Sequence, residues 1–297
     1  RVLIVASYNK SRFAPFITEQ AEALQQTGVQ LDFFGIVGHG PVGYLRNLPA
    51  LRRSIQRFRP DIIHAHYGLS GLLATLQHTV PVVITFHGSD LNDKHIRLLS
   101  RVAARRADFC IRVFDNHERL RPNELIIPCG INLPTGNEQL PPHVLLPGKK
   151  HVIFAGAFDN PVKNAPLALQ TIAQLDNTQL IELKGFTREQ TYALMQHADA
   201  LLLTSHSEGS PQVIKEAMAC GLPIVSTDVG DVSTRIHNVT GCFVAPAPDA
   251  NVLAQLLRQA FAFGRPTNGR NFIISQNLTN DKIADKIIHV YQHLLNQ

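Results

Sequence analysis

Short, almost continuously apolar segments alternate along this chain with longer segments in which apolar residues recur every three or four positions. Five apolar segments come first: Val2–Ser7, Val29–Phe34, Asp61–His66, Val80–His87 and Asp108–Phe114. Strands that are apolar on both faces and separated by helices are typical of a parallel sheet covered by helices on each side. The first part of the chain is therefore expected to be a doubly wound α/β domain.

The alternation stops at residues 132–150, which contain four prolines and two glycines and show no periodicity, as expected of a linker. Strand-like segments then resume at 151–158, 179–186, 198–205, 222–229 and 241–245. The prediction is two Rossmann-like domains, 1–133 and 151–280, joined by a linker at 134–150 and followed by a helix at 281–297. That helix carries an apolar stripe, which we expect to pack across both domains. Its members are Ile283, Ile287, Tyr291 and Leu294.

Composition narrows the class of protein. Hydrophobic residues make up 44% of the 297 residues and charged residues 17%, as in ordinary soluble enzymes. Apolar runs such as Val80–Phe86 are too short to cross a bilayer. The four cysteines are not paired in a CxxC motif, so we expect reduced, mostly buried thiols and a cytoplasmic protein. They are Cys110, Cys129, Cys220 and Cys242.

The segment from Ala198 to Gly230 carries the most chemical information. A strand is expected to end near residue 205, and Ser210–Pro211 is typical of an N-cap followed by the first residue of a helix, which Gly221 would end. A helix N-terminus beside the carboxyl end of a parallel strand favours a bound anion such as a diphosphate. Within this helix Glu216 could accept hydrogen bonds from a ribose diol. Glu208, just before it, could face the hydroxyls of a sugar.

Two acids alone would more often be simply solvated, but the surrounding sequence adds to their meaning. The run from Glu208 to Glu216 matches the E-x7-E motif of the retaining glycosyltransferases of family four, and residues 216–230 (EAMACGLPIVSTDVG) resemble the same family. Four further segments occur in the expected order and spacing: 61–66 (DIIHAH), 85–90 (TFHGSD), 128–132 (PCGIN) and 152–170 (VIFAGAFDNPVKNAPLALQ).

The resemblance implies the GT-B architecture, in which two Rossmann-like domains face each other across a cleft. It implies an acceptor site on the first domain and a nucleotide-sugar donor site on the second. Lys163 matches the family's diphosphate-binding lysine, and His87 matches a histidine that contacts the transferred sugar. The family usually has an arginine directly after a glycine six residues before that lysine, whereas this chain has Gly156–Ala157. One of two expected cations is therefore absent.

The resemblance thus predicts a retaining, metal-independent transfer of a hexose-like sugar from a UDP-type or GDP-type donor. His87 and Glu208 are the predicted catalytic residues. The predicted donor-binding residues are Lys163, Gly209, Ser210, Pro211, Val213, Glu216, Lys184, Gly185 and Phe186, the last three framing the base. The predicted acceptor residues are His66, Tyr67, Asp90 and Arg12. The acceptor is expected to be a carbohydrate or a lipid-linked molecule, as in cell-surface polysaccharide or glycolipid synthesis. No cofactor is expected, since the nucleotide-sugar is a substrate.

Other functions remain open. His64 and His66 share one face of a strand, and with His87 and Asp90 they could hold a zinc ion in a hydrolase. A GT-B-fold protein that binds a nucleotide-sugar without transferring it, or an epimerase or hydrolase of the same architecture, is also compatible with the motifs. The sequence has no GxGxxG after its first strand, no P-loop and no GxSxG, which argues against nicotinamide enzymes, P-loop enzymes and serine hydrolases.

Charge is unevenly distributed. Residues 1–150 contain 18 Lys and Arg against 11 Asp and Glu, whereas residues 151–297 contain 10 against 12. The basic residues cluster around two amphipathic segments, 46–59 and 94–106. Such clusters are often simply solvated, but they also suit an anionic membrane surface, so peripheral membrane association is expected. Nucleic acid is not expected, because no stacking aromatics are interleaved with the basic residues.

Overall fold

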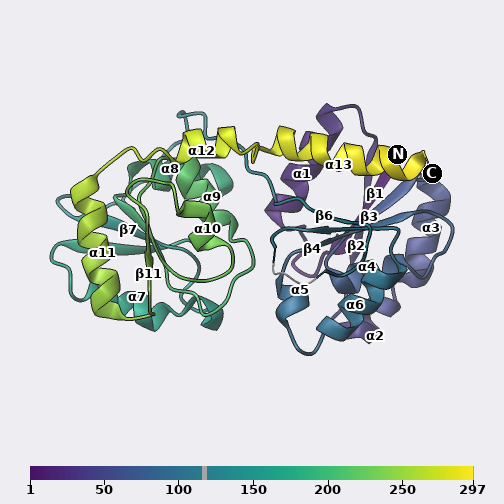
Figure 1. Ribbon diagram of the computed structural model, residues 1–297, viewed down its shortest axis with the longest axis horizontal. Helices are drawn as coiled ribbons and strands as arrows, with labels where there is room; N and C mark the ends of the chain where they lie inside the picture. The colour runs from purple at the N-terminus through teal and green to yellow at the C-terminus, as the bar shows by residue number, and fades with distance from the viewer. Residues whose placement is uncertain (116–118, 297) are drawn as a thin grey trace. The chain divides into compact units, whose positions relative to one another are not determined.

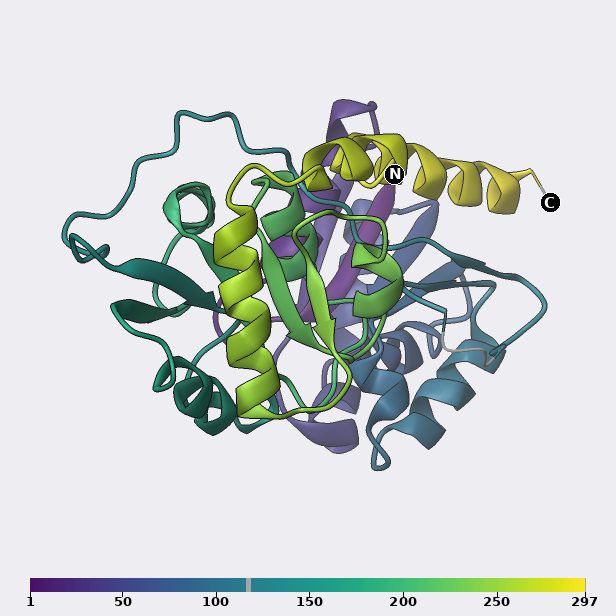
Figure 2. The same ribbon diagram turned by 60° about the vertical axis from the view of Figure 1, so that its left-hand side comes forward.

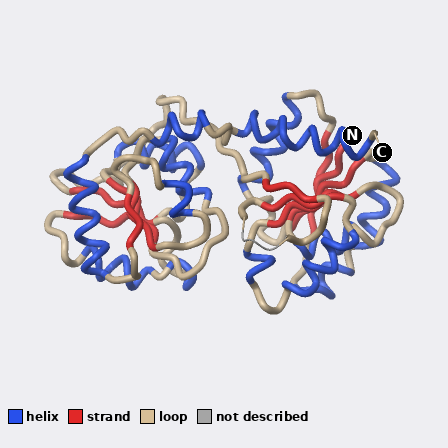
Figure 3. Tube along the Cα trace, viewed as in Figure 1, coloured by secondary structure: helices blue, strands red, loops and turns tan. Residues whose placement is uncertain are grey.

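The computed structural model describes residues 1–115 and 119–296, which form two compact units. The first unit comprises Arg1–Gly130 and the segment from Leu278 onward, and the second comprises Ile131–Asn277. Each unit has a central sheet with helices on both faces (Figures 1 and 3). The predicted fold class, two parallel-sheet α/β domains, is confirmed.

The first unit contains a six-stranded parallel sheet in the order β2-β1-β3-β4-β5-β6. Its strands are β1 (Val2–Ser7), β2 (Leu31–Ile36), β3 (Ile62–His66), β4 (Val82–Phe86), β5 (Phe109–Arg112) and β6 (Glu124–Ile126). The helices are α1 (Pro15–Gln26), α2 (Gly40–Leu45), α3 (Leu48–Phe58), α4 (Gly68–Ala74), α5 (Ser89–Asn92), α6 (Arg97–Arg106) and α13 (Asn280–Leu295).

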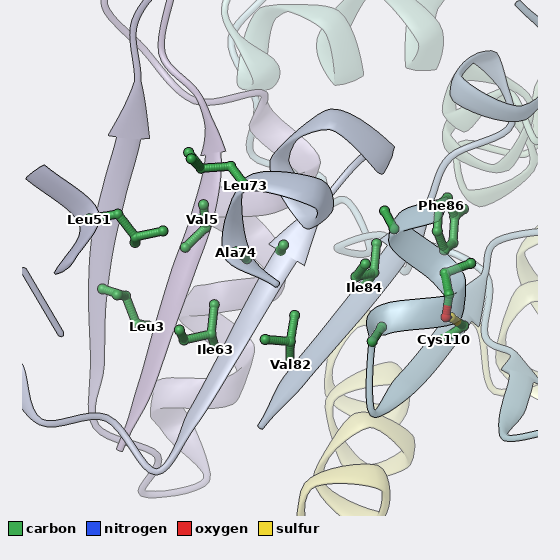
Figure 4. Packing of buried hydrophobic residues seen from close by; sticks show 14 of the residues in the cluster. Leu3, Val5, Leu51, Ile63, Leu73, Ala74, Val82, Ile84, Phe86 and Cys110 are labelled. Atoms are coloured by element: carbon green, nitrogen blue, oxygen red, sulfur yellow. The ribbon is translucent and has the colours of Figure 1, made fainter. Parts of the chain in front are cut away.

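Alternate residues of each central strand enter different cores, because successive side chains of a strand point to opposite faces. Leu3, Val5 and Ile63 pack in one core with Leu51 of α3 and with Leu73 and Ala74 of α4, as Figure 4 shows. Their neighbours Ile4 and Ile62 pack against α1 and α13 instead. Burial on both faces explains why these strands are almost continuously apolar.

The second unit contains a five-stranded parallel sheet in the order β11-β10-β9-β7-β8. Its strands are β7 (Lys150–Phe154), β8 (Thr178–Glu182), β9 (Ala200–Leu203), β10 (Ile224–Thr227) and β11 (Phe243–Ala245). The helices are a 3-10 turn η1 (Pro161–Lys163), α7 (Ala165–Ile172), α8 (Arg188–His197), α9 (Gln212–Ala219), α10 (Val232–Ile236), α11 (Ala250–Phe263) and α12 (Gly269–Ser275). In Figure 2, α11 lies in front of the strands; it packs with α7 over one face of the sheet.

Ten of the eleven strands correspond to predicted segments, with ends shifted by a few residues. The largest shifts are in β7 and β8, which each end four residues earlier than predicted, at Phe154 and Glu182, and β2 is displaced by two residues to Leu31–Ile36. β6 was not predicted. It has three residues at the edge of the sheet, and none of them is buried, so it lacks the apolar run that marks the central strands.

The last helix, α13, was expected to share its apolar stripe between both domains, but that stripe is buried in the core of the first unit. Ile283, Ile287 and Tyr291 pack there with residues of α1 and the sheet. The Tyr291 hydroxyl also forms a 2.6 Å hydrogen bond with Nδ1 of the buried His64 on β3. This bond joins the end of the chain to a strand near its beginning.

Among the described residues, no helix combines the length and the apolar character that crossing a bilayer would require.

Candidate functional site

Loops that follow four neighbouring strands bring charged side chains together at the carboxyl edge of the second unit's sheet. Lys163 follows β7, Arg188 follows β8, Glu208 follows β9 and Asp231 follows β10. Because parallel strands end at the same edge, residues distant in sequence meet here. This edge is where open α/β sheets bind ligands.

Lys163 and Glu208 form the centre of this cluster. The Lys163 Nζ donates to Glu208 Oε1 at 2.6 Å, and the Ser205 hydroxyl donates to the same oxygen at 2.7 Å. Both charged side chains are mostly buried, with 19% and 16% of their surface exposed. A Cβ at Gly156 would lie 2.6 Å from Lys163 Cγ, so only glycine permits this packing. The structure thus joins the predicted diphosphate-binding and catalytic side chains.

The loop before α9 differs from the prediction. Ser210 was expected to be the N-cap and Pro211 the first helical residue, but the helix begins at Gln212 with Pro211 as its N-cap and no side-chain cap. The Ser210 hydroxyl instead donates to Asp231 Oδ2 at 2.8 Å, and Arg235 pairs with that same oxygen at 2.7 Å. The N-cap Pro211 therefore supplies no side-chain cap to α9, and a helix N-terminus at this edge of the sheet favours an anion.

Gly230 brings the loop after β10 against the loop that carries Glu208. Its backbone has a φ of +58°, and a Cβ there would lie 2.1 Å from the Gly209 carbonyl oxygen. The Asp231 N–H donates to that same oxygen at 3.0 Å. The close approach of Gly230 and the hydrogen bond from Asp231 therefore hold the backbone of Gly209 in place.

Glu216 lies on α9 and is buried, with 4% of the residue exposed. Its carboxylate pairs with the guanidinium of Arg188, the first residue of α8. The helix ends as predicted: Gly221 has a φ of +61°, and its N–H donates to the Met218 carbonyl. Val213, another predicted donor residue, is half-buried on the first turn of α9.

The predicted base-framing residues Lys184, Gly185 and Phe186 form the loop between β8 and α8. Gly185 has a φ of +83°, in the region that favours glycine. The Lys184 ammonium donates to Asp159 at 2.6 Å, and both side chains are more than half exposed. This hydrogen bond raises the pKa of Lys184 and lowers that of Asp159. Because Arg188 follows Phe186 by two residues, this loop lies next to the pair that contains Glu216.

In the first unit, four aromatic or imidazole rings gather where β3 and β4 end. His87 Nε2 lies 3.1 Å from His66 Nδ1, and His87 Nδ1 lies 3.6 Å from the sulfur of Cys129. The ring centroids of Tyr67 and Phe16 lie 4.5 and 4.8 Å from that of His87. Two predicted acceptor residues, His66 and Tyr67, therefore surround the predicted catalytic histidine.

His66 is fully buried, and burial lowers its pKa to about 3, so its imidazole is neutral at pH 7. Its Nε2 is buried without a hydrogen-bond partner among the described residues. If the ring proton were on Nε2, a buried N–H donor would have no acceptor, which costs more free energy than a buried acceptor without a donor. The neutral ring is therefore expected to carry its proton on Nδ1, the nitrogen that faces His87.

Asp90 has a different place from the one expected. It was predicted to face the acceptor, but it is 1% exposed and its carboxylate accepts the backbone N–H groups of Gly68, His87 and Gly88. Burial raises its pKa to about 6, against the opposing effect of these hydrogen bonds. Asp90 thus shapes the loop that presents His87. Arg12, the remaining predicted acceptor residue, is exposed in the loop between β1 and α1.

The zinc alternative loses support from the contacts of its proposed ligands. His64 and His66 do share a face, with ring centroids 4.7 Å apart. However, both nitrogens of His64 are occupied, by Tyr291 and by Thr85, and Asp90 is bonded to three N–H groups. Within residues 1–115 and 119–296, no group of three His, Cys, Asp or Glu residues has a geometry suited to a metal ion.

Sequence reasoning did not identify Arg188, Arg235 or the contact between Cys129 and His87. Neither arginine lies in a recognisable sequence motif, and which carboxylate each one pairs with is decided only when the chain folds. Cys129 was interpreted only as a small buried residue. It is buried as expected, and its sulfur also contacts the His87 ring.

Two family models match most of the chain. A model described as "Glycosyl transferase 4-like domain" matches residues 2–117, and one described as "Glycosyl transferases group 1" matches residues 142–262. Among curated proteins, the amylovoran biosynthesis glycosyltransferase AmsK of Erwinia amylovora is 26% identical over 269 residues. That match covers 71% of this chain and 64% of AmsK.

Two solved structures share the fold over almost the whole chain. Sucrose-phosphate synthase from Thermosynechococcus elongatus superposes with a TM-score of 0.78 at 18% identity. The match covers 99% of this chain and 98% of the synthase chain. HepE of Anabaena, solved in complex with UDP, has a TM-score of 0.72 at 15% identity and covers 99% and 100%. Together with the family models, these similarities support a glycosyltransferase family with the GT-B fold.

The buried histidine of the first unit predicts a dependence of stability on pH. His66 has a folded-state pKa of about 3, below its ordinary value of 6.5, so the unfolded chain binds more protons between these values. Stability contributed by neutral His66 is complete above pH 6.5 and is lost as pH falls toward 3. His66→Asn keeps a group near the position of Nδ1 and removes this titration. The stability advantage of the wild type over the variant is expected to shrink by up to about 1.4 kcal/mol per pH unit below 6.5.

Chemical denaturation of both proteins from pH 7.5 to 4.5 measures this difference, with the exposed His95→Asn as the matched control. Parallel pH profiles for the wild type and His66→Asn would show that His66 is not held neutral by burial.

Proposed function

Because both units of this chain match glycosyltransferase family models, we propose that it moves a sugar from a nucleotide-diphosphate-sugar to a carbohydrate or lipid-linked acceptor. The proposed transfer retains the anomeric configuration of the sugar and uses no metal ion. The observation that carries this proposal is the Lys163–Glu208 pair beside the uncapped N-terminus of α9. A cation, a set of backbone N–H groups and a carboxylate here lie at the edge of the sheet where a diphosphate and its attached sugar would bind.

Donor binding exchanges partners within this cluster. The diphosphate accepts from Lys163 and from the N–H groups at the start of α9, replacing Glu208 as the partner of the lysine. Glu208 is then able to accept hydrogen bonds from the hydroxyls of the transferred sugar. Glu216, on the same helix, accepts from the ribose hydroxyls, and the loop that contains Gly185 frames the base.

In the proposed reaction, the acceptor hydroxyl oxygen forms a bond to the anomeric carbon while the bond from that carbon to the diphosphate oxygen breaks. The electron pair of the broken bond goes to the diphosphate, and the proton of the acceptor hydroxyl is transferred to that leaving oxygen. Lys163 and the helix N-terminus stabilise the charge that develops on the diphosphate. The new bond forms on the face that the leaving group vacates, so no covalent enzyme intermediate is needed. His87 is proposed to contact the transferred sugar.

The identity of the base is proposed from a neighbour in fold. HepE, which shares the fold, was solved in complex with UDP. A UDP-type donor is therefore the first candidate and a GDP-type donor the second. Involvement in polysaccharide synthesis is proposed on the similarity to the amylovoran biosynthesis enzyme AmsK.

A membrane surface is the proposed location of the acceptor. One face of α6 presents the exposed side chains of Leu98 and Val102, which are 71% and 37% exposed, between Arg97, Arg101 and Arg105. On such a surface, apolar side chains enter the headgroup region while basic residues attract anionic lipids. The exposed arginines of α3 add to the positive charge of the same unit; they are Arg52, Arg53 and Arg57.

Nucleotide binding is the first prediction. Thermal unfolding is measured with UDP, GDP, ADP and dTDP for the wild type and Glu216→Gln. A nucleotide at 100 times its dissociation constant adds about 2.7 kcal/mol of stability, which raises the melting temperature by roughly 5–10 °C. One nucleotide is expected to stabilise the wild type and to lose most of its effect in Glu216→Gln. Asp176→Asn, an exposed carboxylate ahead of β8, is the matched control. No shift with any nucleotide would contradict the proposed donor site.

The stereochemistry of transfer is the second prediction. With the nucleotide-sugar identified by that panel, the product is expected to keep the anomeric configuration of the donor, as read by proton NMR, and the rate is expected to be unchanged by EDTA. Intact-mass spectrometry is expected to show no sugar attached to the protein. An inverted product, a loss of rate in EDTA or a stable adduct would each refute the corresponding part of the mechanism. Consumption of the donor without an acceptor would favour the epimerase or hydrolase alternative.

Membrane binding is the third prediction. Co-sedimentation with vesicles containing anionic phosphatidylglycerol is expected to be strong at low salt and to fall several-fold in the double variant Leu98→Ser/Val102→Ser. Leu169→Ser, which removes a leucine of α7 that is 52% exposed in the second unit, is expected to bind as the wild type does. Equal binding of all three proteins would exclude α6 as the contact surface.

A further inference from the structure

Glu216, the second acid of the E-x7-E segment, pairs with Arg188, a residue that lies outside that segment. Glu216 is almost completely buried, and its carboxylate meets the guanidinium of Arg188, whose side chain is 28% exposed. A buried carboxylate is costly unless it is paired with a cation and hydrogen-bonded. A cation beside a carboxylate favours its ionised form, which accepts hydrogen bonds and donates none, so the Arg188 pair favours Glu216 as an acceptor.

Arg188 is held rigidly at the start of α8. The preceding residue, Thr187, and the following Gln190 form a reciprocal capping box, in which the Thr187 hydroxyl accepts from the Gln190 N–H and the Gln190 side chain accepts from the Thr187 N–H. The Arg188 guanidinium carbon lies 5.8 Å from the ring centroid of Tyr192. The Tyr192 hydroxyl is in turn bonded to the Asn132 carbonyl at 2.7 Å. These contacts restrain the guanidinium on the side of Glu216, and its planar donors orient the carboxylate that it contacts.

We propose that Arg188 is a positioning residue that holds Glu216 ionised and oriented toward both ribose hydroxyls of the donor, and so makes the protein select ribonucleotides over 2′-deoxyribonucleotides. This inference rests on the proposed donor site. It deepens that proposal, because it assigns the choice of sugar in the nucleotide to an arginine outside the E-x7-E motif.

The physical reason is that a carboxylate discriminates between ligands by the hydrogen bonds it receives. A 2′-deoxynucleotide lacks one hydroxyl donor, so a carboxylate oriented for two donors loses one bond and retains its burial cost. A carboxylate that is free to turn, or is protonated for lack of its cation, loses this discrimination. Removal of Arg188 should therefore weaken ribonucleotide binding selectively, whereas a residue that only stabilises the fold would weaken both ligands equally.

Isothermal titration of the full chain with four ligands tests this inference: UDP, 2′-deoxy-UDP, GDP and 2′-deoxy-GDP. The proteins are the wild type, Arg188→Gln, Arg188→Lys and Glu216→Gln. Arg258→Gln is the matched control, because Arg258 is an exposed arginine of α11 that donates to a backbone carbonyl at 2.7 Å in the same unit.

The wild type and Arg258→Gln are expected to bind the ribonucleotide about tenfold more tightly than its 2′-deoxy analogue. In Arg188→Gln and Glu216→Gln this ratio is expected to fall to about threefold or less, mainly through weaker ribonucleotide binding. Arg188→Lys, which keeps the charge without the planar donors, is expected to give an intermediate ratio. It also serves as the folded comparison should Arg188→Gln be unstable.

Two results would overturn this inference alone. One is an unchanged ratio in Arg188→Gln together with a collapsed ratio in Glu216→Gln. The other is tighter binding of the ribonucleotide by Arg188→Gln, which would show that Arg188 occupies the place of the ribose and must leave. If the wild type binds neither UDP nor GDP, the donor site itself is refuted and this inference falls with it.

Discussion

The parallel direction of β7, β8, β9 and β10 is the constraint on which the second unit's charged cluster depends. Each strand ends at the same edge, and each delivers one loop: Lys163 after β7, Arg188 after β8, Glu208 after β9 and Asp231 after β10. An antiparallel strand among them would turn its loop to the opposite edge and remove one charged group. Parallel sheets are covered on both faces, so their strands must be apolar. The same parallel arrangement that requires apolar strands therefore also brings the polar side chains together.

Three carboxylates of the cluster each have a cation as their partner in the structure. Glu208 is matched by Lys163, Glu216 by Arg188 and Asp231 by Arg235. Pairing in this way lowers the cost of holding carboxylates beside the proposed diphosphate site, because an unpaired carboxylate would repel a diphosphate. The three pairs need not act alike. Lys163 is suited to exchange its partner, since an ammonium is a point charge on a flexible stem, whereas a guanidinium is suited to hold one.

The elements could be predicted from the sequence where a strong local pattern exists, and so could the residues that lie in a motif. The central strands are apolar on both faces, and Lys163 and Glu208 come from segments that resemble a known family. The pairings could not be predicted, because they depend on which loops meet after folding. Ser210 shows the difference: its residue type favours an N-cap, in which its hydroxyl oxygen would accept a backbone N–H. In the structure its hydroxyl donates to the Asp231 carboxylate instead, and that partner is supplied by a different loop. Asp90 has the chemistry of a binding residue, yet three backbone N–H groups take up its carboxylate.

The packing of α13 in the first unit, to which the hydrogen bond between Tyr291 and His64 belongs, affects the order in which the two units can fold during synthesis. The first unit is discontinuous in sequence: its core includes Ile283, Ile287 and Tyr291, which are synthesised after the whole of the second unit. Residues 131–277 can therefore complete their own core while the first unit still lacks one of its covering helices. Domains usually mature in the order of synthesis, from the N-terminus onward. In this chain the later domain is the first that can be finished, and the earlier one is completed only by the last turns of α13.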